Sequence, residues 1–193
     1  VFMVLVDADH RDEAMLKYLE RDRPTLGVYA LSMYGLALHK LGEKEKLADV
    51  MQNISQYVVE DDENQTAYLN MGEGNFWWYG YGSDDEAMAY YLKLLSQTEP
   101  KGRVASRLVK YLLNNRKNGT YWQSTRDTAL CVEALADYLK ASGESKPNLT
   151  VEVWLDGKKR KEVAIDGTNL FSFDNKFVLE GEALAAGRHT LEL

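Results

Sequence analysis

The sequence predicts a mainly α-helical protein, an array of helix pairs followed by a small antiparallel β segment. Three observations support this fold class. Apolar residues recur at helical spacing through the first 141 residues, a helix-capping motif occurs twice at an interval of 41 residues, and beyond residue 147 the pattern changes to alternation. A period of about 40 residues built from helix pairs is typical of arrays of α-hairpins.

The repeated motif is clearest between Gly119 and Thr128. Ser124 is well placed to cap the following helix, because its hydroxyl can accept a backbone N–H of the first turn, and Asp127 stands where a carboxylate reaches back to the cap. Ser83 and Glu86 show the same spacing 41 residues earlier, and a weaker third copy starts at Thr25 with Leu36 in the register of Leu94. A structural role is therefore expected for five residues of the motif: Trp122, Ser124, Thr125, Asp127 and Thr128. Loss of the Asp127 side chain should cost no more than loss of the Ser124 cap.

Six helices in three pairs are expected in the helical region. Their ranges are 10–21, 25–41, 43–58, 84–96, 103–116 and 125–141. The 25–41 helix is apolar nearly all round, which indicates packing on more than one side, whereas the 43–58 and 103–116 helices each carry one apolar stripe. We therefore expect 25–41, 84–96 and 125–141 to form an inner layer, with 10–21, 43–58 and 103–116 outside it.

The segment between the third and fourth helices is the least regular. The acidic run Glu60–Glu63 is expected to be a solvated loop, because it lacks the Asp-x-Asp-x-Asp-Gly pattern of a calcium loop. Residues 65–82 combine aromatic residues with glycines. They are predicted to form either two short strands or an aromatic loop packed over a helix end.

Residues 143–147 read as a linker between a helical region, 1–142, and a β region, 148–193. Strands are expected at 149–155 and 158–165 around an Asp156-Gly157 hairpin turn, with further strands near 171–179 and 189–193. This segment is predicted to be the opening of a small antiparallel β-sandwich.

Composition excludes several classes of function. The net charge of −7 argues against a nucleic-acid partner, which requires a basic surface. No run approaches the ~18 apolar residues of a membrane span. Three scattered histidines and one cysteine predict neither a metal site nor a disulfide framework, and no cofactor is expected. Because the chain starts without methionine and ends in a strand-like segment, we expect it to be a piece of a longer protein.

Several stretches together resemble one protein family. They are Glu86–Tyr90, Leu108–Arg116 and Gly119–Tyr138, followed at once by a β module. This arrangement is similar to the second half of the thioester domain of the alpha-2-macroglobulin family, in particular of its bacterial members. The resemblance covers residues 10–141, and residues 148–193 match the following macroglobulin-like β-domain only by position. It implies a partial α/α toroid, terpenoid-cyclase-like, with concentric inner and outer helices. Arg126 stands where the family more often has glutamine, which should change only surface hydrogen bonding.

The resemblance implies a fragment of a broad-spectrum protease-trapping endopeptidase inhibitor, secreted or periplasmic. Its partners would be proteases, through the full-length parent, and neighbouring domains of the same chain. The family's thiol ester requires a Cys-x-x-Gln ring, but the only cysteine here is Cys131 and Ala134 stands three residues on. Cys131 lies on an apolar helix face, so we expect a buried, unreactive thiol. The chain should be catalytically silent, and uncovered apolar surface should favour self-association.

An α/α-toroid enzyme acting on a glycan or isoprenoid substrate is the alternative. Carboxylates beside aromatic rings suit sugar or carbocation chemistry. The candidate residues are Trp77, Trp78, Asp84, Asp85 and Glu86. A capped helix under an aromatic plug explains the same residues and is favoured. Glycan binding by the aromatic loop without chemistry is a third possibility, which Trp77→Ala and Trp78→Ala would test in a sugar-binding assay.

Overall fold

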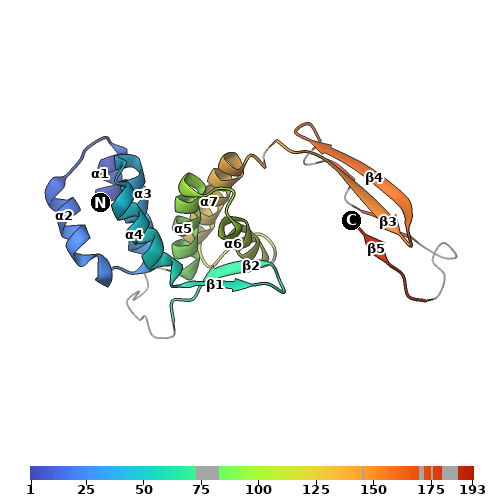
Figure 1. Ribbon diagram of the computed structural model, residues 1–193, viewed down its shortest axis with the longest axis horizontal. Helices are drawn as coiled ribbons and strands as arrows, with labels where there is room; N and C mark the ends of the chain where they lie inside the picture. Colours follow the sequence, from blue (N-terminus) through green and yellow to red (C-terminus); the bar gives the residue numbers. More distant parts are fainter. Residues whose placement is uncertain (73–82, 145, 170–171, 175, 180–186) are drawn as a thin grey trace. The chain divides into compact units, whose positions relative to one another are not determined.

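The computed structural model describes residues 1–72, 83–144, 146–169, 172–174, 176–179 and 187–193. The chain forms two compact units, Val1–Ser142 and Gly143–Leu193, and each is described by itself. The first unit is helical with one β-hairpin, and the second contains an antiparallel sheet (Figure 1). The predicted fold class, mainly α with a small antiparallel β segment, is confirmed.

The helical unit contains the six predicted helices and one more at its start. The elements are α1 (Phe2–Asp7), α2 (Glu13–Asp22), a 3-10 turn at Arg23–Thr25, α3 (Val28–Leu41), α4 (Lys44–Ser55), β1 (Val58–Asp61), β2 (Thr66–Leu69), α5 (Asp84–Thr98), α6 (Arg103–Asn114) and α7 (Thr125–Ser142). Helix α1 is not among the predicted helices.

Local capping explains where the first helices begin and end. Asp12 accepts the backbone N–H of Met15 at 2.9 Å, so α2 begins at Glu13 and not at residue 10. Gly27, in extended conformation, precedes α3, which therefore begins three residues later than predicted. Gly42 has a φ of +73° and ends α3, as the sequence indicates.

The start of α3 also corrects the register of the third repeat. Gly27 is the residue that corresponds to Ser83 and Ser124, because the three stand directly before the first residues of α3, α5 and α7. Leu38, and not Leu36, therefore takes the position of Leu94. Leu38 and Leu94 are both fully buried, which agrees with the corrected register.

The helices pack as a row with a second layer. Helix α3 packs against α1 and α5, and α5 packs against α7, while α4 lies against α3 and α6 against α5 and α7. Eight of the 14 residues of α3 are buried, against two of the 12 residues of α4, so the predicted contrast between them is confirmed. Helix α7 has a single buried stripe, formed by Asp127, Cys131, Ala134 and Tyr138.

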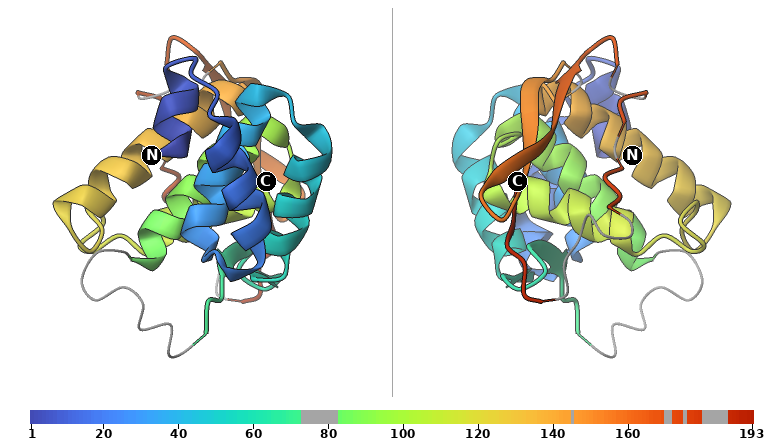
Figure 2. Two further views of the ribbon diagram at one scale, coloured as in Figure 1. Left: turned by 90° about the vertical axis from the view of Figure 1, so that its left-hand side faces the viewer. Right: turned by 90° about the vertical axis from the view of Figure 1, so that its right-hand side faces the viewer.

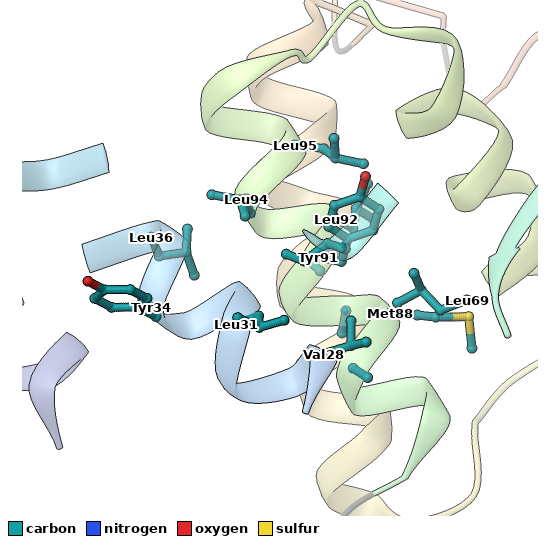
Figure 3. Close-up of a cluster of buried hydrophobic side chains, with 14 of the residues drawn as sticks. Val28, Leu31, Tyr34, Leu36, Leu69, Met88, Tyr91, Leu92, Leu94 and Leu95 are labelled. Carbon is teal, nitrogen blue, oxygen red and sulfur yellow. The ribbon is translucent and has the colours of Figure 1, made fainter. Parts of the chain in front are cut away.

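The core lies between α3 and α5 (Figure 3). Val28 and Leu31 of α3 point towards α5, and Leu69 of β2 lies beside Met88. Tyr34 points the other way and packs on Phe2 of α1, with ring centroids 6.1 Å apart. The row is therefore continuous from α1 through α3 to α5.

The β1–β2 hairpin follows α4 directly (Figure 2). The predicted 43–58 helix is too long, because the chain enters β1 at Val58. The prediction of a solvated loop is wrong for Glu60 and Asp61, which belong to β1. Buried Arg107 holds this acidic segment, with Nη1 3.0 Å from Glu60 and 2.7 Å from Asp62. Of the predicted 65–82 segment, Thr66–Leu69 is a strand, and residues 73–82 lie outside the described residues.

The second unit contains β3 (Asn148–Leu155), β4 (Lys158–Asp166) and β5 (Leu191–Glu192), in the sheet order β4-β3-β5. Asp156 and Gly157 have φ angles of +52° and +72°, as a two-residue hairpin turn requires. The strand predicted near 171–179 is absent from the described residues 172–174 and 176–179. The described strands of the second unit thus form one sheet, and the predicted sandwich is not seen among them.

Candidate functional site

The two copies of the capping motif meet where α5 and α7 begin. Ser83 Oγ accepts the backbone N–H of Glu86 at 3.1 Å, and Ser124 Oγ accepts that of Asp127 at 3.1 Å. This is the capping geometry that the spacing predicts, with extended backbone at Ser83 ahead of α5.

The Asp127 carboxylate joins the two caps. Ser83 Oγ donates to Asp127 Oδ1 at 2.6 Å, and Ser124 Oγ donates to Asp127 Oδ2 at 2.7 Å. Asp127 is 4% exposed. We call Ser83, Asp127 and Ser124 the Asp127 bridge. The bond between Ser83 and Asp127 was not predicted from the sequence, although the repeat that aligns Ser83 with Ser124 contains both partners.

The remaining motif residues hold the approach to α7. Thr128 Oγ1 donates to the Ser124 carbonyl at 2.8 Å and accepts the backbone N–H of Trp122 at 3.2 Å. The Trp122 side chain is buried, and its indole N–H donates to the Leu112 carbonyl of α6 at 3.2 Å. Thr125 is the exposed first residue of α7. The motif therefore fixes α7 to α5 through Asp127 and to α6 through Trp122.

Glu86 occupies in α5 the position that Asp127 occupies in α7, but its contacts differ. It is 2% exposed and forms an ion pair with Arg126 of α7. The pKa of Glu86 is raised, and burial is the main cause. The charge of Arg126 acts in the opposite direction, whereas the charge of Asp127 raises the pKa further. Arg126 was expected to affect surface hydrogen bonding alone, yet it neutralises a buried carboxylate.

The other predicted carboxylates border a pocket of about 320 Å³. Its lining residues are Ser83, Asp84, Asp85, Met88, Tyr111, Asn115 and Gln123. Burial, and secondly the charge of Asp127, raise the pKa of Asp85. Glu86 is not part of this lining, so the three carboxylates of the enzyme alternative do not converge on one pocket. Trp77 and Trp78 lie outside the described residues.

The single cysteine is fully buried. Cys131 is 0% exposed, and its Sγ lies 3.9 Å from the Asp85 carbonyl oxygen. Burial, with the nearby charges of Asp85 and Asp127, raises the pKa of the Cys131 thiol to about 12. Because the thiolate is the nucleophilic form, this side chain is inert at neutral pH.

The described part of the chain shows neither a group of metal-ligating side chains nor a membrane-spanning helix. Among these residues no three His, Cys, Asp or Glu side chains are grouped as metal ligands. The helices that the structure describes are also too short or too polar to cross a bilayer.

Comparison with known proteins gives two matches. The family model of the A-macroglobulin TED domain matches residues 7–138. A curated relative, "Alpha-2-macroglobulin" of Thermotoga maritima, is 26% identical over 132 residues, which is 63% of this chain and 8% of that protein. The chain therefore spans a small part of this relative. The family match runs from the end of α1 into α7 and stops before the β unit.

Proposed function

Since the chain belongs to the A-macroglobulin thioester-domain family, we propose that it is a structural and interaction module of a protease-trapping macroglobulin, an endopeptidase inhibitor and not an enzyme. In this proposal the helical unit is the second half of the α/α toroid, and the β unit is the start of the following macroglobulin-like domain. The alternation of a helix row with a second layer supports the first assignment. The name of the Thermotoga relative, "Alpha-2-macroglobulin", supports a macroglobulin as the parent protein.

The placement of Cys131 is the observation that carries the proposal. A thiol-ester protein needs a cysteine accessible to an acyl acceptor, with a glutamine three residues on in this family. Here the only thiol is fully buried in the α5–α7 contact, and Ala134 follows at that spacing. The role left to this chain is to support a thiol-ester site that the parent carries elsewhere or has lost.

The partners and the location follow from the same proposal. The parent would act on proteases in an extracytoplasmic compartment, periplasmic, cell-envelope or secreted. This chain would contact neighbouring domains of the same polypeptide, and its helical row would hold them in place. Its acidic balance, with a net charge of −7, fits protein and not nucleic-acid contacts.

Intact-mass measurement tests the inert state of the chain. The purified chain is incubated with a lysine-rich protease, with methylamine and with iodoacetamide, in native buffer and in denaturant. We expect no adduct in native buffer and a single alkylated thiol at Cys131 in denaturant, which serves as the positive control. A native adduct at Cys131 or at any glutamine would contradict the proposal.

Protease capture by the full-length parent tests the trapping function. A protease that binds the parent should co-elute with it on size exclusion and lose activity towards large substrates. If the parent neither binds nor inhibits a panel of endopeptidases, the trapping function is wrong even though the family assignment stands.

The enzyme alternative is not favoured by the family match. Turnover of a prenyl diphosphate or a glycan by the purified chain would nevertheless bring it forward. Asp85→Asn is the appropriate variant for that assay, because Asp85 borders the pocket and is not part of the Asp127 bridge.

A further inference from the structure

We propose that the Asp127 bridge is a coupling device, through which the N-terminal ends of α5 and α7 open and close as one unit. The proposal concerns the conformational behaviour of the helical unit and holds whatever the parent protein does. It assigns to Asp127 a role between helices, in addition to its place in the cap of its own helix.

The proton count of the bridge shows why the two helices depend on each other. Each serine hydroxyl has one proton and also accepts a backbone N–H, so its proton is free for one acceptor. Both serines direct that proton to Asp127, one to each carboxylate oxygen, at 2.6 and 2.7 Å. If the first turn of α5 opens, Asp127 Oδ1 loses the Ser83 donor.

Because Asp127 is buried, the opening of α5 and the opening of α7 are energetically coupled. With Asp127 4% exposed, water cannot readily replace a lost donor, and a buried carboxylate oxygen without one is costly. The free energy of opening α5 therefore includes a contribution from α7, and the reverse. A hydrogen bond to a carboxylate is also stronger than one between two neutral groups, which increases this contribution.

The bridge needs a side chain that accepts at two atoms, because one serine hydroxyl donates to each carboxylate oxygen of Asp127. Asp127 lies near the carboxylates of Asp85 and Glu86 on α5, and after burial its charge contributes to the raised pKa of both. Arg126 forms an ion pair with Glu86, and the hydroxyls of Ser83 and Ser124 donate to Asp127. An asparagine at this position keeps the shape but can accept on one atom only.

The neighbouring helix pair provides an internal contrast. Gly27 takes the place of Ser83 at the start of α3 and has no hydroxyl. No equivalent bridge can therefore form from the start of α3, and the α3–α5 contact depends on apolar packing. The coupling is a property of α5 and α7, which lets α3 serve as the reference in the same molecule.

Native-state hydrogen exchange on the full chain tests the proposal with Ser83→Ala and Asp127→Asn. Ser83→Ala alters α5 directly, yet it should speed exchange in the first turn of α7 as well, on the order of tenfold. Asp127→Asn should do the same in the first turn of α5. Ser106→Ala is the matched control, because its exposed hydroxyl donates only to the Arg103 carbonyl within α6.

Faster exchange confined to the substituted helix, or spread evenly over α3, α5 and α7, would contradict the coupling. A double-mutant cycle in urea gives a second measurement that does not depend on exchange. Ser83→Ala and Asp127→Asn together should shift the unfolding midpoint clearly less than the sum of their separate shifts. Additive shifts would overturn the proposal, because they would show two independent caps.

Discussion

Two residues in the same motif position, Asp127 and Glu86, perform different tasks. Asp127 accepts two serine hydroxyls, whereas Glu86 is balanced by the Arg126 guanidinium. The difference arises at the neighbouring helix and not in the motif, because Ser83 faces Asp127 from α5. A position in a repeat therefore specifies a conformation, and its neighbours specify the interaction.

Substitutions in the Asp127 bridge should separate the cap from the bond between helices. Ser124→Ala should lower the free energy of unfolding by about 1 kcal/mol, as expected for a lost N-cap. Asp127→Ala should cost more, about 2 to 4 kcal/mol, because it removes the buried carboxylate that accepts the hydroxyls of both Ser83 and Ser124. Urea unfolding measures both. If Asp127→Ala costs no more than Ser124→Ala, the expectation from the sequence was right and the bond to Ser83 contributes nothing.

The stability of the α5–α7 contact should depend on pH through Glu86. Burial raises the pKa of Glu86 in the folded state, so the folded chain holds the proton more tightly than the unfolded chain. The wild type should therefore gain stability relative to Glu86→Gln as the pH falls from neutral towards 4.5, the ordinary value. Thermal unfolding across this range checks the sign, and a relative loss of stability on acidification would contradict it.

Part of the site could be predicted from the sequence. The spacing of Ser124 and Asp127 indicated a cap, since capping depends on residues within one turn of helix. The bond between Ser83 and Asp127 could not be predicted in this way, because it depends on how two helices are rotated against each other. The ion pair of Arg126 with Glu86 was missed for the same reason.

At the scale of elements, α3 approaches both α5 and α4 closely at Gly35. A Cβ atom built on Gly35 would lie 2.7 Å from Leu94 Cδ2 and 3.4 Å from Val50 Cγ1. Leu94 and Val50 are fully buried, so a shift of either side chain would disturb its packed neighbours. Glycine here lets α3 approach α5 and α4 at the same point along its length.

Gly35→Ala should therefore destabilise the protein, although alanine is the better helix former. Overpacking of a filled core costs about 1 to 3 kcal/mol, and the gain in helix propensity returns at most about 1 kcal/mol. Leu94→Val should reduce the penalty when the two substitutions are combined, because it removes the Cδ atoms in the way. A rise in thermal stability of the single variant would show that the helices can separate without cost.

Element boundaries were predicted best where a local signal marks them. Helices α5, α6 and α7 begin at the predicted residues, directly after Ser83, Gly102 and Ser124. Strand β1 was missed because its acidic residues look solvated in the sequence, whereas in the structure Arg103 and Arg107 both form ion pairs with Glu60. Helix α1 is six residues long, too short for a periodicity to be recognised.

At the scale of the whole molecule, an exposed apolar side of α7 next to its buried stripe matters most. Its apolar residues Val132 and Leu139 are 54% and 37% exposed. They stand seven positions apart, so they lie on one side of the helix. A stripe of this kind at the end of a helix row is suited to contact another helix.

We expect the isolated chain to self-associate through this face of α7. Val132→Glu should shift the equilibrium towards monomer and leave thermal stability within about 0.5 kcal/mol, because the side chain is largely exposed. Analytical ultracentrifugation over a range of concentrations measures the effect. Lys140→Glu is the control for added negative charge on α7. Association that Val132→Glu does not weaken would place the contact elsewhere.

The packing of α3 on α5 and of α5 on α7 also affects how fast the protein folds. The bond from Ser83 to Asp127 joins residues 44 apart, and the ion pair from Lys93 to Glu133 joins residues 40 apart. Chain closure over such distances has a modest entropic cost that grows slowly with loop length. Folding can therefore start at one helix pair and spread to its neighbours, as in other linear arrays. Stopped-flow measurements on the helical unit should show relaxation within milliseconds, as local helical topologies do.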